Sequence, residues 1–241
     1  MSRIGVLGGM GPSATVDFME KIIQLTPASR DQDHLPVVIA NLPHIPDRSR
    51  AILGEGPDPL PALIQGIDLL NVAAVGVIVI PCNSSHHWYT QMAQRSHCPV
   101  IHIAHACVAA VPMDSDAQPA KVAILATRGA LVSGFYQAAL QQRGLEFVIP
   151  DASTGQNEVD QCIRAVKAGD VLAGARALEQ ALVLIATTQV SAVIMGCTEI
   201  PVAARHAAAS GLTLIDSSLE LARATVAFAL DKGWNRFACA G

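Results

Sequence analysis

Two stretches of the sequence end in the same way, and they constrain the fold more than any other feature. Residues 75–87 read VGVIVIPCNSSHH, in which a run of apolar, mostly β-branched residues stops at Pro81 and is followed by Cys82. Residues 190–201 read VSAVIMGCTEIP, in which a similar run is followed by Cys197. Runs of this kind are typical of strands that are buried on both faces of a parallel sheet. Two such strand ends predict a duplicated fold with one thiol in each half.

The segments before the two cysteines repeat the same order of elements. In each half a strand, a helix, a second strand and a second helix precede the strand that ends in cysteine. The stretch from Leu7 to Cys82 is nearly as long as the stretch from Leu125 to Cys197. Any α/β protein can show such spacing, but a cysteine at the same strand end in both halves favours a true repeat. Strands that alternate with helices indicate parallel sheets with right-handed crossovers.

We therefore predict an α/β fold with two pseudo-symmetric three-layer αβα domains. Each domain has a mainly parallel four-stranded sheet, and the active site lies in the cleft between the domains. We place the first domain at residues 1–103 plus 213–241, with the C-terminal helix closing on it, and the second at residues 104–212. Residues 41–61 form a long turn-rich loop, and loops of that length in a compact domain are usually functional or mobile.

Charge and composition limit the compartment and the partners. The formal net charge is −4 and the sequence contains no basic run, so it gives no reason to expect nucleic acid or an anionic membrane as a partner. The N-terminal residues MSRIGVLGGMG read as a strand and not as a signal peptide. No apolar run approaches the length that a membrane span needs. We expect a cytoplasmic protein whose six cysteines are mostly free thiols.

The predicted positions of the two cysteines suggest a reaction. Ligands of open parallel sheets bind outside the carboxyl ends of the strands, where both Cys82 and Cys197 are expected. A thiolate on one side of a carbon atom and a thiol on the other could remove a proton from one face and return it to the opposite face. A helix N-terminus after each cysteine would lower the pKa of its thiol. Backbone N–H groups together with Asn83, Ser84 and Thr198 could hold a carboxylate there.

These motifs are similar to those of a known family. The chain resembles the aspartate/glutamate racemase family, and most closely its aspartate racemases. The resemblance covers nearly the whole chain in the same order. It rests on these stretches: GVLGGMGPSAT (5–15), RDQDH (30–34), IPDRSRAILGEGPDP (45–59), PCNSSHH (81–87), LATRGALVSGFY (125–136), VKAGD (166–170) and GCTEIP (196–201).

The resemblance implies a cofactor-independent racemase that interconverts L- and D-aspartate, usually as a homodimer, with Cys82 and Cys197 as the catalytic residues. It implies eight residues that bind a small acidic amino acid: Met10, Arg48, Asn83, Ser84, Thr127, Lys167, Thr198 and Glu199. Arg48 and Lys167 would hold the distal carboxylate, and Glu199 would lie near the α-ammonium group. The other five would hold the α-carboxylate.

Other readings stay open at this point. Relatives in the same superfamily include broad-specificity amino-acid racemases, hydantoin racemases, maleate isomerases and arylmalonate decarboxylases, and some of them need only one cysteine. The presence of Arg48 favours an acidic substrate, since some broad-specificity relatives lack that arginine. A non-catalytic protein that binds an acidic amino acid would also fit a cleft between two domains.

Three further patterns receive little support. Residues 9–14 fit G-x-G-x-x-A, but no acidic residue follows the next strand to bind a ribose, so a dinucleotide site is disfavoured. The histidines and cysteines at 97–107 fall partly on a predicted strand, whose side chains alternate between faces, which argues against a metal site. None of the four lysines lies in a loop suited to pyridoxal phosphate.

Overall fold

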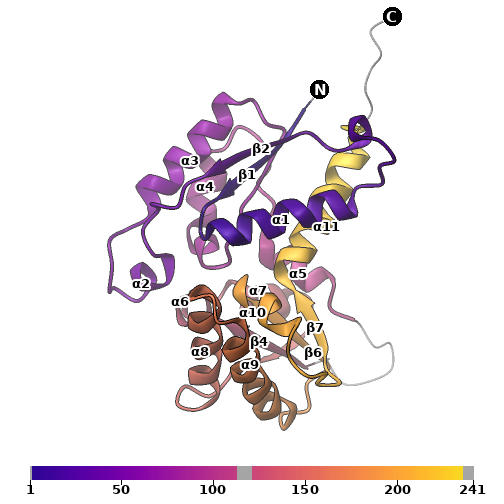
Figure 1. The fold of residues 1–241 in the computed structure, drawn as a ribbon. Helices are drawn as coiled ribbons and strands as arrows, with labels where there is room; N and C mark the ends of the chain where they lie inside the picture. Colours follow the sequence, from indigo (N-terminus) through magenta and orange to yellow (C-terminus); the bar gives the residue numbers. More distant parts are fainter. Residues whose placement is uncertain (1, 113–120, 236–241) are drawn as a thin grey trace, which may run out of the picture.

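Two parallel sheets organise the chain in the computed structural model, which describes residues 2–112 and 121–235 (Figure 1). The first sheet has the strand order β2-β1-β3 and consists of Ile4–Gly8 (β1), Val37–Asn41 (β2) and Val77–Val79 (β3). The second has the order β5-β4-β6-β7 and consists of Lys121–Ala126 (β4), Glu146–Val148 (β5), Ala192–Gly196 (β6) and Thr213–Asp216 (β7). We call the parts built on these sheets the N-lobe and the C-lobe.

The order β2-β1-β3 of the N-lobe recurs as β5-β4-β6 in the C-lobe, and every described strand pairing is parallel. In both sheets the first strand of the half lies between the second and the third. The strand that leads to Cys82 and the strand that leads to Cys197 therefore occupy equivalent places. This arrangement confirms the predicted α/β class and the pseudo-symmetry of its two halves.

Helices cover the sheets and lie mostly beside the sheet of their own half. The N-terminal half contains Pro12–Leu25 (α1), Arg48–Ile52 (α2), Leu60–Val72 (α3), Tyr89–Arg95 (α4) and Ile103–Ala109 (α5), with 3-10 helices at Asp31–Asp33 (η1) and Ser84–Trp88 (η2). The C-terminal half contains Arg128–Ser133 (α6), Phe135–Gln142 (α7), Gly155–Lys167 (α8), Val171–Ala186 (α9), Glu199–Ala204 (α10) and Ser217–Asp231 (α11).

The core of each lobe has two parts because alternate side chains of a strand point to opposite faces of the sheet. In β1, Ile4 packs with Phe18 of α1 on one face. Leu7 of the same strand packs with Leu63 of α3 on the other face. The strands of the C-lobe divide in the same way, with α8, α9 and α10 on one face and α5 and α7 on the other. Each lobe is thus a three-layer αβα unit.

Residues 99–103 do not form the fourth strand predicted for the first sheet. Ile78 pairs with this segment through only two backbone hydrogen bonds, of 2.9 and 3.1 Å. The segment stops pairing because α5 begins at Ile103, where the His102 ring accepts a hydrogen bond from the backbone N–H of Ala104 at 3.1 Å. Within residues 2–112 the N-lobe sheet therefore has three strands, whereas the C-lobe sheet has the predicted four.

The last strand and the last helix connect the two lobes. β7 pairs with β6, so residues 213–216 belong to the C-lobe sheet, although the predicted boundary assigned everything after residue 212 to the first domain. α11 then runs back along α1, and its Leu221 and Val226 join the N-lobe core (Figure 1). The Lys21 ammonium of α1 bonds the Asp216 carboxylate at 2.8 Å, where β7 ends. The chain crosses between the lobes before α5 and again after β7.

Candidate active site

All ten residues that the sequence predicts for the site line one small cavity between the lobes. The cavity has a volume of about 30 Å³ and lies at the carboxyl ends of β1, β3, β4 and β6. The lining comprises these ten, namely Met10, Arg48, Cys82, Asn83, Ser84, Thr127, Lys167, Cys197, Thr198 and Glu199, together with two that the sequence reasoning missed, Asp47 and Ser49. The fold thus brings together motifs that extend from the turn after β1 to the start of α10.

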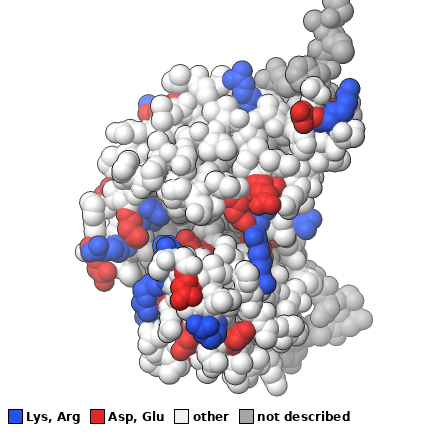
Figure 2. Space-filling model, viewed as in Figure 1, with Lys and Arg blue, Asp and Glu red and all other residues white. Residues whose placement is uncertain are grey.

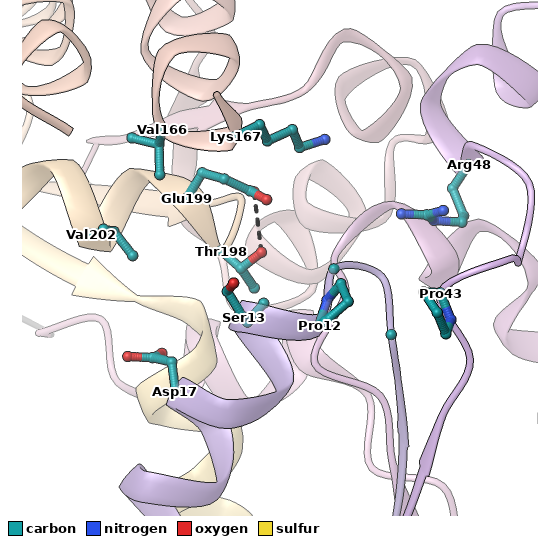
Figure 3. A pocket seen from close by; sticks show the side chains of 13 residues that line it. Pro12, Ser13, Asp17, Pro43, Arg48, Val166, Lys167, Thr198, Glu199 and Val202 are labelled. Atoms are coloured by element: carbon teal, nitrogen blue, oxygen red, sulfur yellow. Dashed lines mark hydrogen bonds between the residues drawn. The ribbon is translucent and has the colours of Figure 1, made fainter. Parts of the chain in front are cut away.

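A wider pocket of about 370 Å³ adjoins this cavity. The two share Arg48, Lys167, Thr198 and Glu199. The wider pocket is otherwise lined by the turn after β1, the start of α1, the end of α8, Pro43 and Val202. Figure 3 shows that Arg48 and Lys167 approach it from opposite sides. In the space-filling view, charged side chains gather along the hollow between the lobes (Figure 2). We interpret the wider pocket as the entrance to the inner cavity.

The loop that holds Cys82 is fixed by its own neighbours. The Cys82 carbonyl accepts a hydrogen bond from the Ser85 hydroxyl at 2.7 Å and lies 3.0 Å from Nδ1 of His86. The backbone N–H of Ile103 donates to His86 Nε2 at 3.2 Å. The ring proton must therefore be on Nδ1, where it bonds the Cys82 carbonyl. Burial lowers the pKa of His86 to about 4, which keeps the ring neutral. The segment after Cys82 begins as the 3-10 helix η2 and not as the α-helix expected there.

Cys197 has a different environment. Its thiol donates a hydrogen bond to Oε2 of Glu199 at 3.0 Å, and the Thr198 hydroxyl donates to the same oxygen at 3.1 Å. Burial and the negative charge of Glu199 raise the pKa of Cys197 well above the usual value, while the positive charge of Lys167 opposes them. Cys197 is therefore held as a neutral thiol whose proton lies against a carboxylate.

Two cationic side chains face the same space from different lobes. The Arg48 guanidinium donates to the backbone carbonyls of Ile45, Pro46 and Met10 at 3.1, 3.0 and 3.4 Å, so it also holds the loop that precedes α2. Burial lowers the pKa of Lys167, but nearby negative groups, Glu199 first among them, outweigh this and raise it. Lys167 thus stays protonated. In the described chain neither cation forms a salt bridge, which leaves both charges available to an anion.

Hydroxyl groups join the two lobes beside the cysteines. The Ser84 hydroxyl lies 2.9 Å from that of Thr127, which also accepts the backbone N–H of Ala130 as the N-cap of α6. The backbone N–H of Gly129 donates to Ser49 Oγ at 3.1 Å, and a Cβ atom added to Gly129 would lie 2.7 Å from that oxygen. The loop that carries Arg48 therefore contacts the C-lobe closely through α2 and α6.

Asp47 was missed although it lies beside a predicted residue. Its side chain accepts a hydrogen bond from the backbone N–H of Arg50 at 2.9 Å and caps α2. This capping pattern, an aspartate before a short helix, is visible in the sequence. Its place in the cavity is not, because that depends on how α2 packs against the C-lobe.

Gly9, the first residue after β1, has a packing role. Gly9 has a φ of +92°, and a Cβ atom added there would lie 2.4 Å from the backbone of Leu42. Only glycine fits such a conformation and such a close approach. The close passage of the loop after β2 therefore requires a glycine at position 9.

Metal centres and membrane spans find no support in the described chain. Among residues 2–112 and 121–235, no three histidine, cysteine or acidic side chains are grouped so that they could bind a metal ion. In the same part of the chain, no helix is long and apolar enough to cross a membrane.

Sequence comparisons find related proteins over nearly the whole chain. The sequence model of the Asp/Glu/hydantoin racemase family matches residues 7–225. The broad specificity amino-acid racemase RacX of Bacillus subtilis is 32% identical over 228 residues, which cover 92% of this chain and 96% of that protein.

Solved structures show the same fold. An aspartate racemase of Picrophilus torridus superposes with a TM-score of 0.78 at 30% identity, over 95% of this chain and 94% of that one. A glutamate racemase of Francisella tularensis, solved in complex with D-glutamate, has a TM-score of 0.71 at 17% identity, over 98% and 84% of the two chains. The second likeness concerns the fold alone.

Proposed function

The chain belongs to the Asp/Glu/hydantoin racemase family, and on that premise we propose that it interconverts L- and D-aspartate by exchange of the α-proton between Cys82 and Cys197. No cofactor takes part in this reaction. The observation that carries the proposal is the placement of the two cysteines. One comes from each lobe, each follows the equivalent strand of its sheet, and both line one cavity.

The different environments of the two thiols support a direction for the first proton transfer. Cys197 is held as a thiol by Glu199, so Cys82 acts as the thiolate base. The Cys82 sulfur forms a bond to the α-proton, and the electron pair of the broken C–H bond stays on the α-carbon and its carboxylate. The Cys197 S–H bond then breaks and delivers its proton to the opposite face.

Each turnover exchanges the states of the two cysteines. After the transfer Cys82 is a thiol and Cys197 is a thiolate, which is the form that starts the reverse reaction. The positive charge of Lys167 lowers the pKa of Cys197 and so stabilises this second form. Since a two-base racemase must work in both directions, the cavity needs a group on the Cys197 side that counters the charge of Glu199.

The choice of an acidic substrate rests on Arg48 and Lys167. Both side chains lie at the junction of the cavity and its entrance, come from different lobes, and form no salt bridge with the described residues. Two cations that face each other across the entrance of a site favour a ligand with a carboxylate at its far end. The aspartate racemase of Picrophilus torridus, at 30% identity, supports the same choice.

A broader substrate range is the second candidate. The Bacillus subtilis relative is named a broad specificity racemase and is 32% identical over nearly the whole chain. The Arg48 guanidinium already donates to three backbone carbonyls, so part of its hydrogen-bonding capacity is used within the protein. An amino acid without a distal carboxylate would then lose less affinity than the two positive charges suggest.

Solvent deuterium exchange tests the proposal. In deuterated water the protein should incorporate deuterium at the α-carbon of both L- and D-aspartate, followed by loss of optical activity. Cys82→Ser and Cys197→Ser should each reduce racemisation by at least about a thousandfold, because each removes one of the two proton-transfer groups. The matched control is Cys98→Ser, which replaces a free cysteine that does not line the cavity.

Three outcomes would contradict the proposal in different ways. Native-level racemisation by either single variant would exclude the two-thiol mechanism. Faster exchange with alanine or serine than with aspartate would favour the broad range. Binding of aspartate without exchange of its α-proton would indicate a binding protein.

A further inference from the structure

Tyr136 is a fully buried side chain that lies outside the cavity, and its role is not explained by packing alone. It lies in α7 and is the largest fully buried side chain among the described residues. Its ring packs in the C-lobe core with Ile194 and Leu140. A buried phenolic hydroxyl needs a hydrogen-bond partner, and the partner identifies the role of the residue.

The Tyr136 hydroxyl donates to Oδ1 of Asn83 at 2.5 Å, across the boundary between the lobes. Nδ2 of Asn83 donates to the Ser217 hydroxyl at 3.1 Å, and that hydroxyl donates to the carbonyl of Met195 at 2.8 Å. Ser217 has one proton, and the Met195 carbonyl takes it. Ser217 can therefore only accept from Asn83, which requires the amide nitrogen to face it.

This series of bonds determines how the Asn83 amide is presented. Its oxygen faces Tyr136, and one N–H of its nitrogen faces Ser217. In the described chain no partner engages the second N–H, and Asn83 lines the cavity beside Cys82. Without the tyrosine proton, the amide oxygen would be buried without a partner, and the side chain could turn its oxygen toward an incoming carboxylate.

We propose that Tyr136 is a positioning residue, which fixes the Asn83 amide so that its second N–H binds the α-carboxylate of the substrate. The inference rests on the proposed function for the identity of the ligand, although the Tyr136–Asn83 contact does not depend on it. The α-carboxylate takes up negative charge when the α-proton leaves, so a donor held in place at that point lowers the barrier.

The position of the tyrosine ring adds a second connection. A Cβ atom added to Gly196 would lie 3.1 Å from Cε2 of Tyr136, so the ring lies directly against the residue that precedes Cys197. Its hydroxyl meanwhile bonds the residue that follows Cys82. One side chain thus contacts the neighbours of both cysteines, and it positions the Asn83 amide relative to both strand ends.

Tyr136→Phe tests the inference because it keeps the buried ring and removes only the hydroxyl. We expect the side-chain amide protons of Asn83 to exchange with solvent at least about tenfold faster in ¹⁵N NMR spectra of the full-length protein. We expect kcat/KM for aspartate to fall about tenfold to a hundredfold, the range for one hydrogen bond to a charged group. The control is Tyr89→Phe, which removes a hydroxyl that bonds the Val100 carbonyl at 3.0 Å, away from the cavity, and should leave both quantities unchanged.

The Asn83→Ala background distinguishes a role of the Tyr136 hydroxyl in positioning Asn83 from a merely structural role. There Tyr136→Phe should change kcat/KM, followed by slow deuterium incorporation, by less than about twofold. An equal loss in both backgrounds would overturn the inference, as would Asn83 amide exchange that is unchanged in Tyr136→Phe. If the native protein racemises no amino acid, the proposed function fails, and the amide exchange alone still decides whether Tyr136 holds Asn83.

Discussion

The contact between Cys197 and Glu199 leads to a quantitative prediction. Glu199→Gln keeps an oxygen that can accept the thiol proton but removes the negative charge 3.0 Å from the sulfur. The repulsion between a thiolate and a carboxylate at that separation is about 1.4 kcal/mol in bulk water and about 5.5 kcal/mol at the effective dielectric constant of about 20 that suits protein sites. Removal of this repulsion should therefore lower the pKa of Cys197.

The assay is the rate of alkylation by iodoacetamide as a function of pH. The Cys82→Ser background leaves Cys197 as the thiol of the cavity, and mass spectrometry of its peptide separates it from the other cysteines. The midpoint should shift to lower pH in Glu199→Gln and stay in place in Glu199→Asp, where the charge is kept. An unchanged midpoint in Glu199→Gln would refute the conclusion that the carboxylate holds Cys197 as a thiol.

Two further predictions concern substrate choice and stability. Arg48→Ala should lower kcat/KM for aspartate by about tenfold to a hundredfold and for alanine much less, because alanine has no distal carboxylate. An equal loss with both substrates would show that the change acts through the loop carbonyls. The folded-state pKa of His86 is depressed to about 4 from 6.5, so the unfolded chain takes up the proton first as the pH falls. The neutral His86 ring therefore makes its full contribution to the free energy of unfolding above the unfolded-state pKa. As the pH falls from the unfolded-state pKa to the folded-state pKa, the free energy of unfolding should decrease by about 1.4 kcal/mol per pH unit. Urea denaturation at a series of pH values measures this decrease. In His86→Gln the free energy of unfolding should depend less on pH, and equal slopes in the variant and the native protein would contradict the prediction.

The sequence contained most of the site because each of its parts lies next to a strand end or in a compact motif. Cys82 and Cys197 follow apolar runs whose period and length predict buried strands, and the parallel topology then brings both strand ends to one cleft. Asp47 and Ser49 flank Arg48 within the stretch 45–59, so the sequence already contained them, but only Arg48 was singled out.

What the sequence could not reveal depends on contacts between distant segments. Tyr136 and Asn83 are 53 positions apart, and Asn83 and Ser217 are 134 apart, so no local pattern connects them. The hydrogen bond from the Cys197 thiol to Glu199 was hidden for a different reason, because these two residues are close in the sequence. Two similar cysteine motifs suggest equivalent roles, whereas the carboxylate of Glu199 reaches the sulfur of Cys197 only once the loop is folded.

The predicted fourth strand of the N-lobe sheet is absent from the described residues because a helix competes with it for the same segment. Residues 99–103 have the alternation of a strand, but the His102 side chain caps α5, which begins before a fourth strand can lengthen. Side chains that bond the nearby backbone offer it an alternative to the hydrogen bonds of a sheet. The length of this strand at the edge of the sheet is limited by the helix that follows it. The alternation of apolar residues in the sequence carries no information about that limit.

The double crossing of the chain between the lobes has a mechanical consequence. One crossing precedes α5, the other precedes α11, and these two helices pack against each other. Because the chain connects the lobes at two adjacent points, the lobes can rotate about the line that joins these points, but they resist twisting and sliding relative to each other. The inner cavity of about 30 Å³ has room for water molecules rather than an amino acid, so admission of a substrate requires the walls to separate. We expect the lobes to separate most at the contact between Ser49 and Gly129. Since the lobes rotate about one line, Cys82 and Cys197 should return to the same relative positions each time the cleft closes.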